Sequence, residues 1–217
     1  RAYATNGVGT AYGSQYVVKT MYGTVTDYDG NTYQTVMIGT QEWMAENLRV
    51  THYRNGDAIP NITDNGQWSV ATSGAYCSYE NSSSNASTYG LLYNFYAVAD
   101  ARNLCPTGWH VPTDAEWTTP TDYLGGLNVA GAKLKSPNLW TSGSTGTDNS
   151  SGFTALPSGY RYSDGKFYEI TRIGDWWSSS VFSSSNAWFR NIDFTNSDVI
   201  QGKDGKRIGS SVRCVKD

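Results

Sequence analysis

The chain has 217 residues, of which 16% are charged and 14% aromatic, and its formal net charge is −3. This length is enough for one large domain or two small ones with a sizeable core. A slightly acidic chain has no broad positive field for phosphate groups, which argues against nucleic acid as a partner. No run approaches the roughly 18 apolar residues of a membrane span, so no transmembrane segment is predicted. The many aromatic, Ser, Thr, Asn and Gly residues are typical of a β-rich protein with polar loops.

Turn signals dominate the N-terminal part. Residues 1–13 alternate around Asn6-Gly7, and this dipeptide is a strong signal for a tight hairpin. A second hairpin is predicted over 24–38 with Asp29-Gly30 at its turn, and a third turn at 54–57. Because the chain begins without Met or a signal-like apolar run, we interpret it as a trimmed, mature fragment of a longer protein.

Two helices are predicted in the middle of the chain. Between residues 89 and 103, apolar residues recur at helical spacing, namely Leu92, Tyr93, Phe95, Tyr96 and Ala99. A second helix should begin at Asp114, because Thr113 is a good N-cap and Glu116 completes a capping box. Pro120 falls inside this helix and cannot donate a backbone hydrogen bond. We therefore expect the helix to kink or end there.

The remainder reads as loops and strands. Residues 141–152 and 178–186 are rich in Ser, Thr, Asn and Gly and are predicted to be loops. Residues 187–200 alternate weakly, as strands broken by turns do, and residues 211–215 form a terminal strand. These elements predict an α+β fold with a mixed, mainly antiparallel sheet.

Two segments identify the chain best: Cys105-Pro-Thr-Gly-Trp-His-Val-Pro-Thr-Asp-Ala-Glu-Trp117 and the closing Ser211-Val-Arg-Cys214-Val. Further motifs are Trp43-Met-Ala-Glu-Asn-Leu48, Tyr89-Gly-Leu-Leu-Tyr-Asn94, Gly146-Thr-Asp-Asn-Ser-Ser-Gly-Phe153, Ala155-Leu-Pro-Ser-Gly-Tyr-Arg161 and Trp176-Trp-Ser-Ser-Ser180. Together they resemble the bacterial Fibrobacter succinogenes major paralogous domain family over residues 22–217. Residues 1–21 resemble the terminal hairpin, or a linker, of a fibronectin-type-III-like module.

The resemblance implies a C-type-lectin-like α+β fold, related to the formylglycine-generating enzymes, with a twisted antiparallel sheet, two helices and long loops. It also implies that the N- and C-terminal parts of the domain meet at Cys105 and Cys214. We therefore predict a disulfide between them, with Cys77 free. Such a bond requires an oxidising compartment. The alternative is three reduced, buried thiols.

Signals for catalysis are weak. Asp114 and Glu116 resemble the carboxylate pair of a glycosidase, but acids in a first helical turn also complement the helix dipole. His52 and His110 lie in no catalytic motif, and a packing role is expected for His110. The formylglycine-generating enzymes depend on a close cysteine pair that binds copper, and this chain has no second cysteine near any candidate thiol. No catalytic residue is predicted.

Calcium is a second candidate ligand, since lectin-like domains often hold this ion. Asp148 and Asn149 offer oxygen ligands in a tight turn, but Asx-turn hydrogen bonds explain them equally well. The Glu-Pro-Asn or Gln-Pro-Asp triplet of calcium-dependent lectins is absent. The calcium signal at these two residues is therefore weak, and no other cofactor is predicted.

The strongest candidate for binding is the segment 176–206, which interleaves aromatic and short polar side chains as antibody paratopes do. An alternating strand must place part of this run outward. We assign three aromatic residues to the core: Trp176, Phe189 and Phe194. We predict a ligand-binding surface formed by Trp188, Arg190, Asn191, Asp193, Asn196 and Asp198.

These observations predict a non-catalytic, monomeric recognition domain of adhesin or receptor-binding type. It would act outside the cell, as part of a bacterial surface protein or of a phage particle. Its ligand would be an unidentified protein or glycan. In some members of the lectin-like group, diversity-generating retroelements vary this C-terminal stretch, where Asn186, Asn191 and Asn196 lie. The alternatives are a carbohydrate-active or formylglycine-generating-like enzyme, and a structural spacer in a multidomain surface protein.

Overall fold

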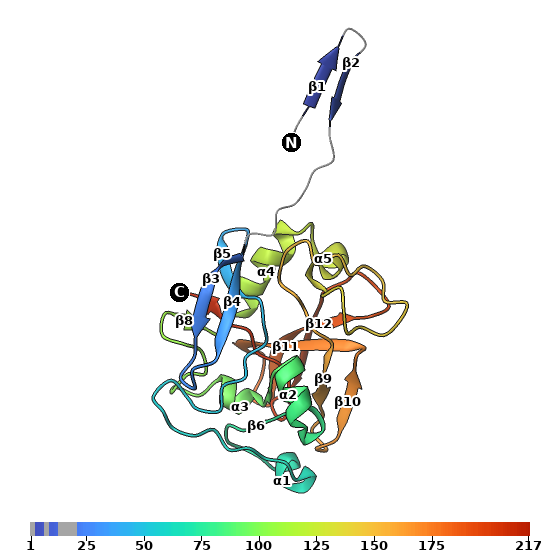
Figure 1. Cartoon of the computed structure of the whole chain (residues 1–217). Coiled ribbons are helices and arrows are strands. Elements are labelled where there is room, and N and C mark those ends of the chain that lie inside the picture. Colours follow the sequence, from blue (N-terminus) through green and yellow to red (C-terminus); the bar gives the residue numbers. More distant parts are fainter. Residues whose placement is uncertain (1–2, 7–8, 13–20) are drawn as a thin grey trace.

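The computed structural model describes residues 3–6, 9–12 and 21–217, and these show a mixed α+β architecture with more strand than helix (Figure 1). Two five-stranded sheets form most of it. Apolar residues of both sheets enter the same two large core clusters, so the sheets share one interior. Within this described part, no helix has the length and apolar character that crossing a membrane requires.

Both predicted N-terminal hairpins are present. β1 (Tyr3–Asn6) pairs antiparallel with β2 (Gly9–Tyr12), and the predicted Asn-Gly turn between them lies partly outside the described residues. β3 (Met21–Thr26) pairs antiparallel with β4 (Thr32–Ile38). Gly30, in the turn between β3 and β4, has a φ of 82°. Glycine adopts this left-handed conformation without a steric cost, which is why the Asp-Gly signal located the turn.

The first five-stranded sheet has the strand order β3-β4-β5-β14-β8. β5 (Gln41–Met44) pairs with β4, and the last strand of the chain, β14 (Val215–Lys216), lies between β5 and β8 (Trp109–His110). The C-terminus therefore lies beside β8 (Figure 1). This pairing brings the two identifying segments into one sheet.

The second sheet has the order β10-β9-β11-β12-β13. Its strands are β9 (Ser158–Arg161), β10 (Phe167–Ile170), β11 (Ile173–Val181), β12 (Asn186–Asp193) and β13 (Ile200–Gly205). Neighbours pair antiparallel except β9 and β11, which are parallel. The sheet is therefore mixed and mainly antiparallel, as predicted.

The prediction of a loop over 178–186 is correct for residues 182–185, which form the turn between β11 and β12, and wrong for residues 178–181 and Asn186, which belong to these strands. β11 continues to Val181, which pairs with Ala187 of β12 after a register shift. The serines fit this irregular strand because their hydroxyls bind nearby backbone: the hydroxyl of Ser180 accepts the N–H of Asp114, and that of Ser178 accepts the N–H of Ser180. Composition alone does not reveal such pairing. The predicted loop at 141–152, in contrast, contains neither helix nor strand.

The capped helix is confirmed. α4 (Asp114–Tyr123) begins where the hydroxyl of Thr113 accepts the N–H of Glu116, while the Glu116 carboxylate accepts the N–H of Thr113. We expected the helix to kink or end at Pro120; it does not end there, because it continues to Tyr123. A proline in this place removes one helix hydrogen bond, and the residue is buried against the core. A second helix, α5 (Leu127–Leu134), follows directly.

The single helix predicted over 89–103 is wrong. The chain instead forms a series of short elements: α2 (Ser83–Tyr89), β7 (Leu92–Tyr93) and α3 (Phe95–Val98). Before them come α1 (Asn65–Ser69), β6 (Tyr76–Cys77) and η1 (Tyr79–Asn81). β6 and β7 pair antiparallel as a small separate sheet.

Gly90 and Asn94 explain this division. Gly90 follows α2 with a φ of 81°, and a Cβ atom there would lie 2.8 Å from the Cβ atom of Asn47. The Asn94 side chain accepts the N–H of Ala97 and so begins a new helix. Leu92 and Tyr93, between these two points, are buried in β7, whereas Phe95 and Tyr96 belong to α3, so the helical spacing of these residues does not reflect one continuous helix.

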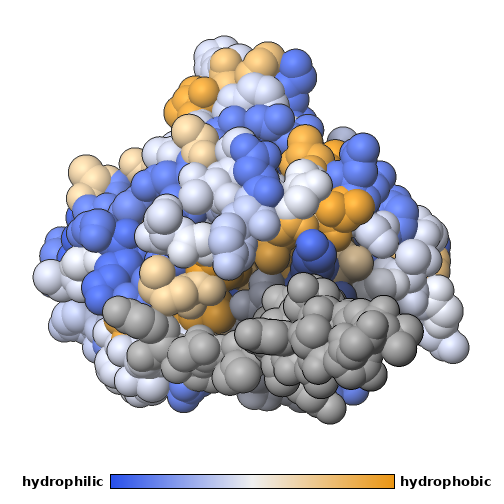
Figure 2. Space-filling view, turned by 90° about the horizontal axis from the view of Figure 1, so that it is seen from above, coloured by the Kyte–Doolittle hydropathy of each residue, from blue (hydrophilic) through white to orange (hydrophobic). Residues whose placement is uncertain are grey.

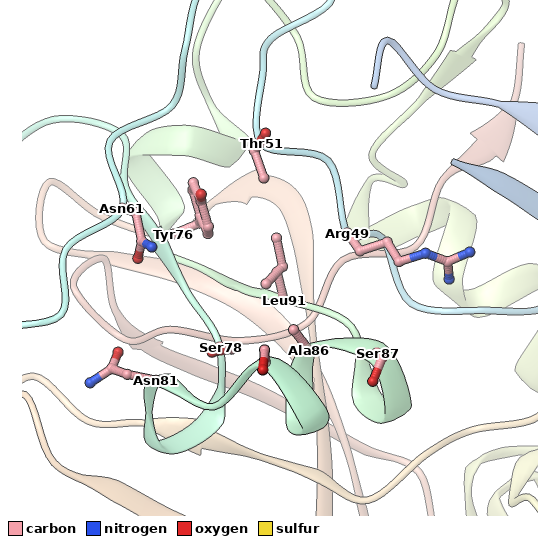
Figure 3. Close-up of a pocket in the computed structure, with 10 residues that line it drawn as sticks. Arg49, Thr51, Asn61, Tyr76, Ser78, Asn81, Ala86, Ser87 and Leu91 are labelled. Carbon is pink, nitrogen blue, oxygen red and sulfur yellow. The ribbon is translucent and has the colours of Figure 1, made fainter. Parts of the chain in front are cut away.

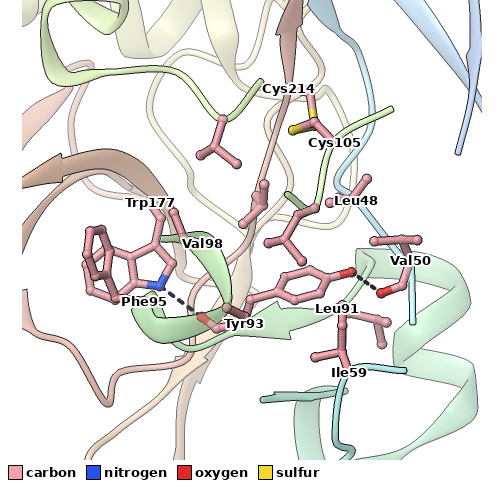
Figure 4. Packing of buried hydrophobic residues seen from close by; sticks show 14 of the residues in the cluster. Leu48, Val50, Ile59, Leu91, Tyr93, Phe95, Val98, Cys105, Trp177 and Cys214 are labelled. Carbon is pink, nitrogen blue, oxygen red and sulfur yellow. Dashed lines mark hydrogen bonds between the residues drawn. A yellow bond between two sulfur atoms is a disulfide. The ribbon is translucent and has the colours of Figure 1, made fainter. Parts of the chain in front are cut away.

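The largest core cluster is built around Tyr93 (Figure 4). Its hydroxyl donates to the carbonyl oxygen of Val50 at 2.7 Å, and its own carbonyl accepts the indole N–H of Trp177 at 2.8 Å. Both polar groups of these large buried side chains are therefore satisfied, as burial requires. Trp177 also packs edge-on against Phe95.

The predicted disulfide is confirmed. Cys105 and Cys214 are bonded, with an S–S distance of 2.04 Å, and Cys77 is free and buried. The bond closes a loop with a sequence separation of 109 residues. In the chain-entropy model, a loop of this length gives about 4–5 kcal/mol of stabilisation.

Candidate functional site

Several sequence motifs converge on one buried guanidinium, that of Arg213. It donates to Oδ1 of Asn47 at 2.9 Å and to the carbonyl oxygens of Phe153 and Thr154. The indole N–H of Trp176 donates to the same Asn47 oxygen at 2.8 Å, and the guanidinium lies 4.0 Å from the Phe153 ring centroid. Burial lowers the pKa of Arg213, while the surrounding oxygens stabilise its charge. The motifs that contain Asn47, Phe153, Trp176 and Arg213 therefore meet in a buried hydrogen-bonded network, which we call the buried scaffold.

The carboxylate of Glu116 also has a structural role. It accepts the N–H and the hydroxyl of Thr113, and its other oxygen lies 2.9 Å from Nε2 of His110. Burial by itself would lower the pKa of His110, but the hydrogen bonds to Asp217 and Glu116 raise it. The interpretation of Glu116 as a capping residue is confirmed, and His110 packs between two carboxylates.

Arg190 is the clearest error among the predicted binding residues. We expected it to be exposed, but only 1% of its surface is accessible. Its Nη1 lies 2.5 Å from Oδ1 of Asp114, and Nη2 donates to the carbonyl oxygen of the same residue. Oδ2 of Asp114 accepts from the side chain of Gln201. Because α4 covers this face of β12, Arg190 ties the start of α4 to the sheet and is not available to a ligand.

Trp188 is half-buried and lies on the same face of β12, closer to the β11–β12 turn. Its ring packs edge-on against Phe182 at a centroid distance of 5.1 Å, and Phe182 is 44% exposed. Nζ of Lys203, the register partner of Trp188 on β13, lies 3.8 Å from the Phe182 ring centroid. We call these three residues the aromatic–lysine cluster.

Asn191 projects from the opposite face of β12, as successive strand residues do. Its side-chain amide donates to Oδ1 of Asp175 on β11 at 2.6 Å. Asp175 is only 6% exposed. Burial raises the pKa of Asp175 to about 7; the Asn191 hydrogen bond opposes this shift and the charge of Asp204 adds to it. The sequence analysis missed Asp175, although an acid directly before Trp176 in an apolar strand was a usable signal.

The last three predicted residues lie in or beside the turn between β12 and β13, and all three are half-buried. Oδ1 of Asp193 accepts the N–H and the hydroxyl of Thr195, and Oδ1 of Asn196 accepts the N–H of Asp198. Nζ of Lys135 donates to the carbonyl oxygen of Asn196. These side chains stabilise the turn. The six predicted residues thus occupy four separate environments and form no single surface.

Trp176 is fully buried and belongs to the core, as predicted, whereas Phe189 and Phe194 are half-buried. Phe189 packs edge-on against Trp177, and Phe194 lies under the guanidinium of Arg172 at 4.9 Å. The remaining exposed hydrophobic side chains of the described residues are scattered over several elements. On the visible part of the face in Figure 2, hydrophobic residues form small groups among hydrophilic ones.

The turn proposed for calcium is held by its own hydrogen bonds. Oδ1 of Asp148 accepts the N–H of Ser150, and the side chain of Asn149 bonds to both the N–H and the hydroxyl of Thr154. Across the described parts of the chain, no group of three or more His, Cys, Asp or Glu side chains lies close enough together to hold a metal ion. A calcium titration would test the two residues directly.

The fold and the site define a disulfide-bonded α+β domain. Its motifs build a buried scaffold, and its β11–β12 hairpin, which we call the C-terminal hairpin, presents a small aromatic cluster. The chain matches the Fibrobacter succinogenes major domain family over residues 36–216, and it belongs to this family. The matched range contains the main sequence motifs and both bonded cysteines. Comparison with curated proteins and with solved structures found no match.

Proposed function

We propose that this domain is a non-catalytic recognition module of adhesin or receptor-binding type, with a C-type-lectin-like fold, which acts outside the cell. The observation that carries the proposal is the aromatic–lysine cluster of Phe182, Trp188 and Lys203. It lies at the end of strands that leave the buried scaffold at Trp176 and return to it at Ser211. Aromatic side chains that are held rigidly and remain accessible are typical anchors of recognition surfaces.

The disulfide supports an extracellular location, because such bonds persist in oxidising compartments. The ligand class that fits the cluster is a protein or a glycan with an apolar surface for the two rings and an acceptor group for the lysine. The same hairpin carries Asn186 and Asn191, in the stretch that retroelements vary in some lectin-like proteins. A template repeat and a reverse transcriptase gene beside this gene would support variation here, and their absence would count against it.

The cysteines argue against an activity like that of the formylglycine-generating enzymes. Cys105 and Cys214 are bonded to each other. Cys77 is buried, and burial raises the pKa of its thiol to about 12. Since the thiolate is the nucleophile and the metal ligand, none of the three sulfur atoms is prepared for this chemistry.

Binding should be tested on protein and glycan arrays, with turnover of glycans and thiol peptides measured in parallel. We expect binding without turnover, and at least a tenfold loss of affinity when Phe182 and Trp188 are both replaced by alanine. The control replaces Tyr123, an exposed aromatic residue on α4, by alanine. Equal affinity of the two variants would refute the proposed surface. Turnover of a glycan or a thiol peptide would favour an enzyme. The absence of binding on every array would favour a structural spacer.

A further inference from the structure

A pocket of about 440 Å³ lies away from the C-terminal hairpin, between α2, β6 and the segments that contain Thr51 and Asn61 (Figure 3). Three of its lining side chains are apolar or aromatic: Tyr76, Ala86 and Leu91. The others are mainly hydroxyls and amides: Thr51, Asn61, Ser78, Asn81, Ser83 and Ser87. Its volume is within the usual range of small-molecule sites.

Small residues of α2 line one side of the pocket. Ser83, Ala86 and Ser87 have the spacing i, i+3 and i+4, so they share one face of the helix, and all three line the pocket. All three have short side chains, so they occupy little of the pocket volume. The helix therefore presents two hydroxyls and one methyl group to the space.

Tyr76 forms a rigid aromatic wall. Its N–H donates to the carbonyl of Pro60, and its own carbonyl accepts the N–H of Ile62, so its backbone is fixed on both sides. The ring is half-buried and packs against the main core cluster. Among the described residues, the hydroxyl of Tyr76 and the side chains of Asn61 and Ser83 have no hydrogen-bond partner. These groups are available to a ligand.

The charged groups beside the pocket already have partners within the protein. Arg49 is the single charged residue in its lining, and its side chain extends away from Tyr76 and Leu91 (Figure 3). Nη1 of Arg49 lies 3.1 Å from a carboxylate oxygen of Glu46. Burial raises the pKa of Tyr76 and the charge of Asp29 adds to this shift, so Asp29 lies near the pocket; its Oδ2 already accepts the N–H and the hydroxyl of Thr51. Because Arg49 and Asp29 each already have an oppositely charged or titratable partner, in Glu46 and His52, the pocket favours a ligand without a formal charge.

We propose that this pocket binds a neutral saccharide unit. A pyranose ring has a face of C–H groups, which would lie against Tyr76, Ala86 and Leu91, and hydroxyl groups at its edge. These hydroxyls would exchange hydrogen bonds with the amides and hydroxyls around the pocket. The inference goes beyond the proposed function, because the hairpin contributes no residue to this site.

The test uses ligand-detected NMR and calorimetry with glucose, galactose, mannose and N-acetylglucosamine, as free sugars and as disaccharides. We expect at least one of them to bind, and Ser87→Trp to weaken that binding at least tenfold by filling the pocket. The matched control is Ser84→Trp, which places the same side chain on the same helix at an exposed position outside the pocket lining. It should keep the affinity of the wild type. Melting curves establish that both variants are folded.

Three outcomes would overturn this inference: no binding of any sugar in the panel, binding only of charged ligands, or unchanged affinity in a folded Ser87→Trp variant. The pair Ser87→Trp and Trp188→Ala separates this site from the hairpin. Sugar binding lost only in Trp188→Ala would refute the pocket and support the hairpin surface. Sugar binding lost only in Ser87→Trp would support the pocket, and the proposed function of the hairpin would then depend on the array results alone.

Discussion

Replacing Asp175 by Asn should stabilise the folded protein at pH 8. The carboxyl is buried, accepts a hydrogen bond from Asn191, and has no cationic partner among the described residues. Asparagine has nearly the same shape and retains the oxygen that Asn191 contacts. The substitution therefore removes a buried charge and leaves the local hydrogen bond in place.

The size of the effect follows from the pKa of Asp175. It is about 7 in the folded protein, against an ordinary value of 3.8. A group whose pKa rises on folding contributes stability that is fully present below the unfolded value. That contribution is lost as the pH rises through the folded value. The difference corresponds to at most about 4 kcal/mol, and solvent penetration reduces it, so we expect about 2–4 kcal/mol.

The assay is denaturant unfolding of both proteins at pH 4, 6 and 8. The advantage of Asp175→Asn should be small at pH 4 and should increase to its full value at pH 8. Groups common to both proteins cancel in this comparison, including Asp100, whose side-chain hydrogen bond with Arg102 lowers its pKa to about 2. Asp122→Asn, at an exposed position on α4, is the control. A difference in stability that does not change with pH would refute the reasoning.

Three further predictions concern the scaffold. Arg213→Met should cost about 3–5 kcal/mol, because it leaves buried carbonyl oxygens unpaired, and urea unfolding that shows less than about 1 kcal/mol would contradict this. Trp117→Ala should cost a similar amount in the same assay, since the ring is buried in the core cluster. Peptide mapping without reductant should recover a linked Cys105–Cys214 pair, with Cys77 alkylated only after denaturation; any bridge that contains Cys77 would contradict the pairing.

The turn and the helix start that sequence analysis predicted correctly depend on neighbours in the chain, whereas the Cys105–Cys214 pairing followed from the family resemblance. The Asp29-Gly30 turn and the Thr113–Glu116 capping box each follow from residues one to three positions apart, so tertiary contacts hardly change them. The helix predicted over 89–103 depended on spacing alone. There Gly90, with a positive φ and packed against Asn47, follows the end of α2, and the chain then continues as β7 rather than as a helix.

The binding residues were harder to predict, because alternation along a strand defines two faces but does not say what covers each face. Arg190 is buried because α4 packs on its side of β12, and Asp114 at the start of that helix pairs with it. Asn191, one position further, meets a buried acid from the neighbouring strand. Both arrangements depend on the order of strands and helices in space, which a single sequence does not display.

The positions of Arg190 and Asn191 also limit where recognition can vary. Both lie in the middle of β12. A substitution at Arg190 would remove the ion pair with Asp114 at the start of α4, and one at Asn191 would remove the hydrogen bond to the buried carboxyl of Asp175. Phe182 and its neighbours at the β11–β12 turn are accessible, and surface substitutions typically change stability by less than about 0.5 kcal/mol. If this hairpin presents different ligand-binding residues in different relatives, the changes should therefore concentrate at the turn and at the exposed positions of β13, while the centre of β12 stays fixed.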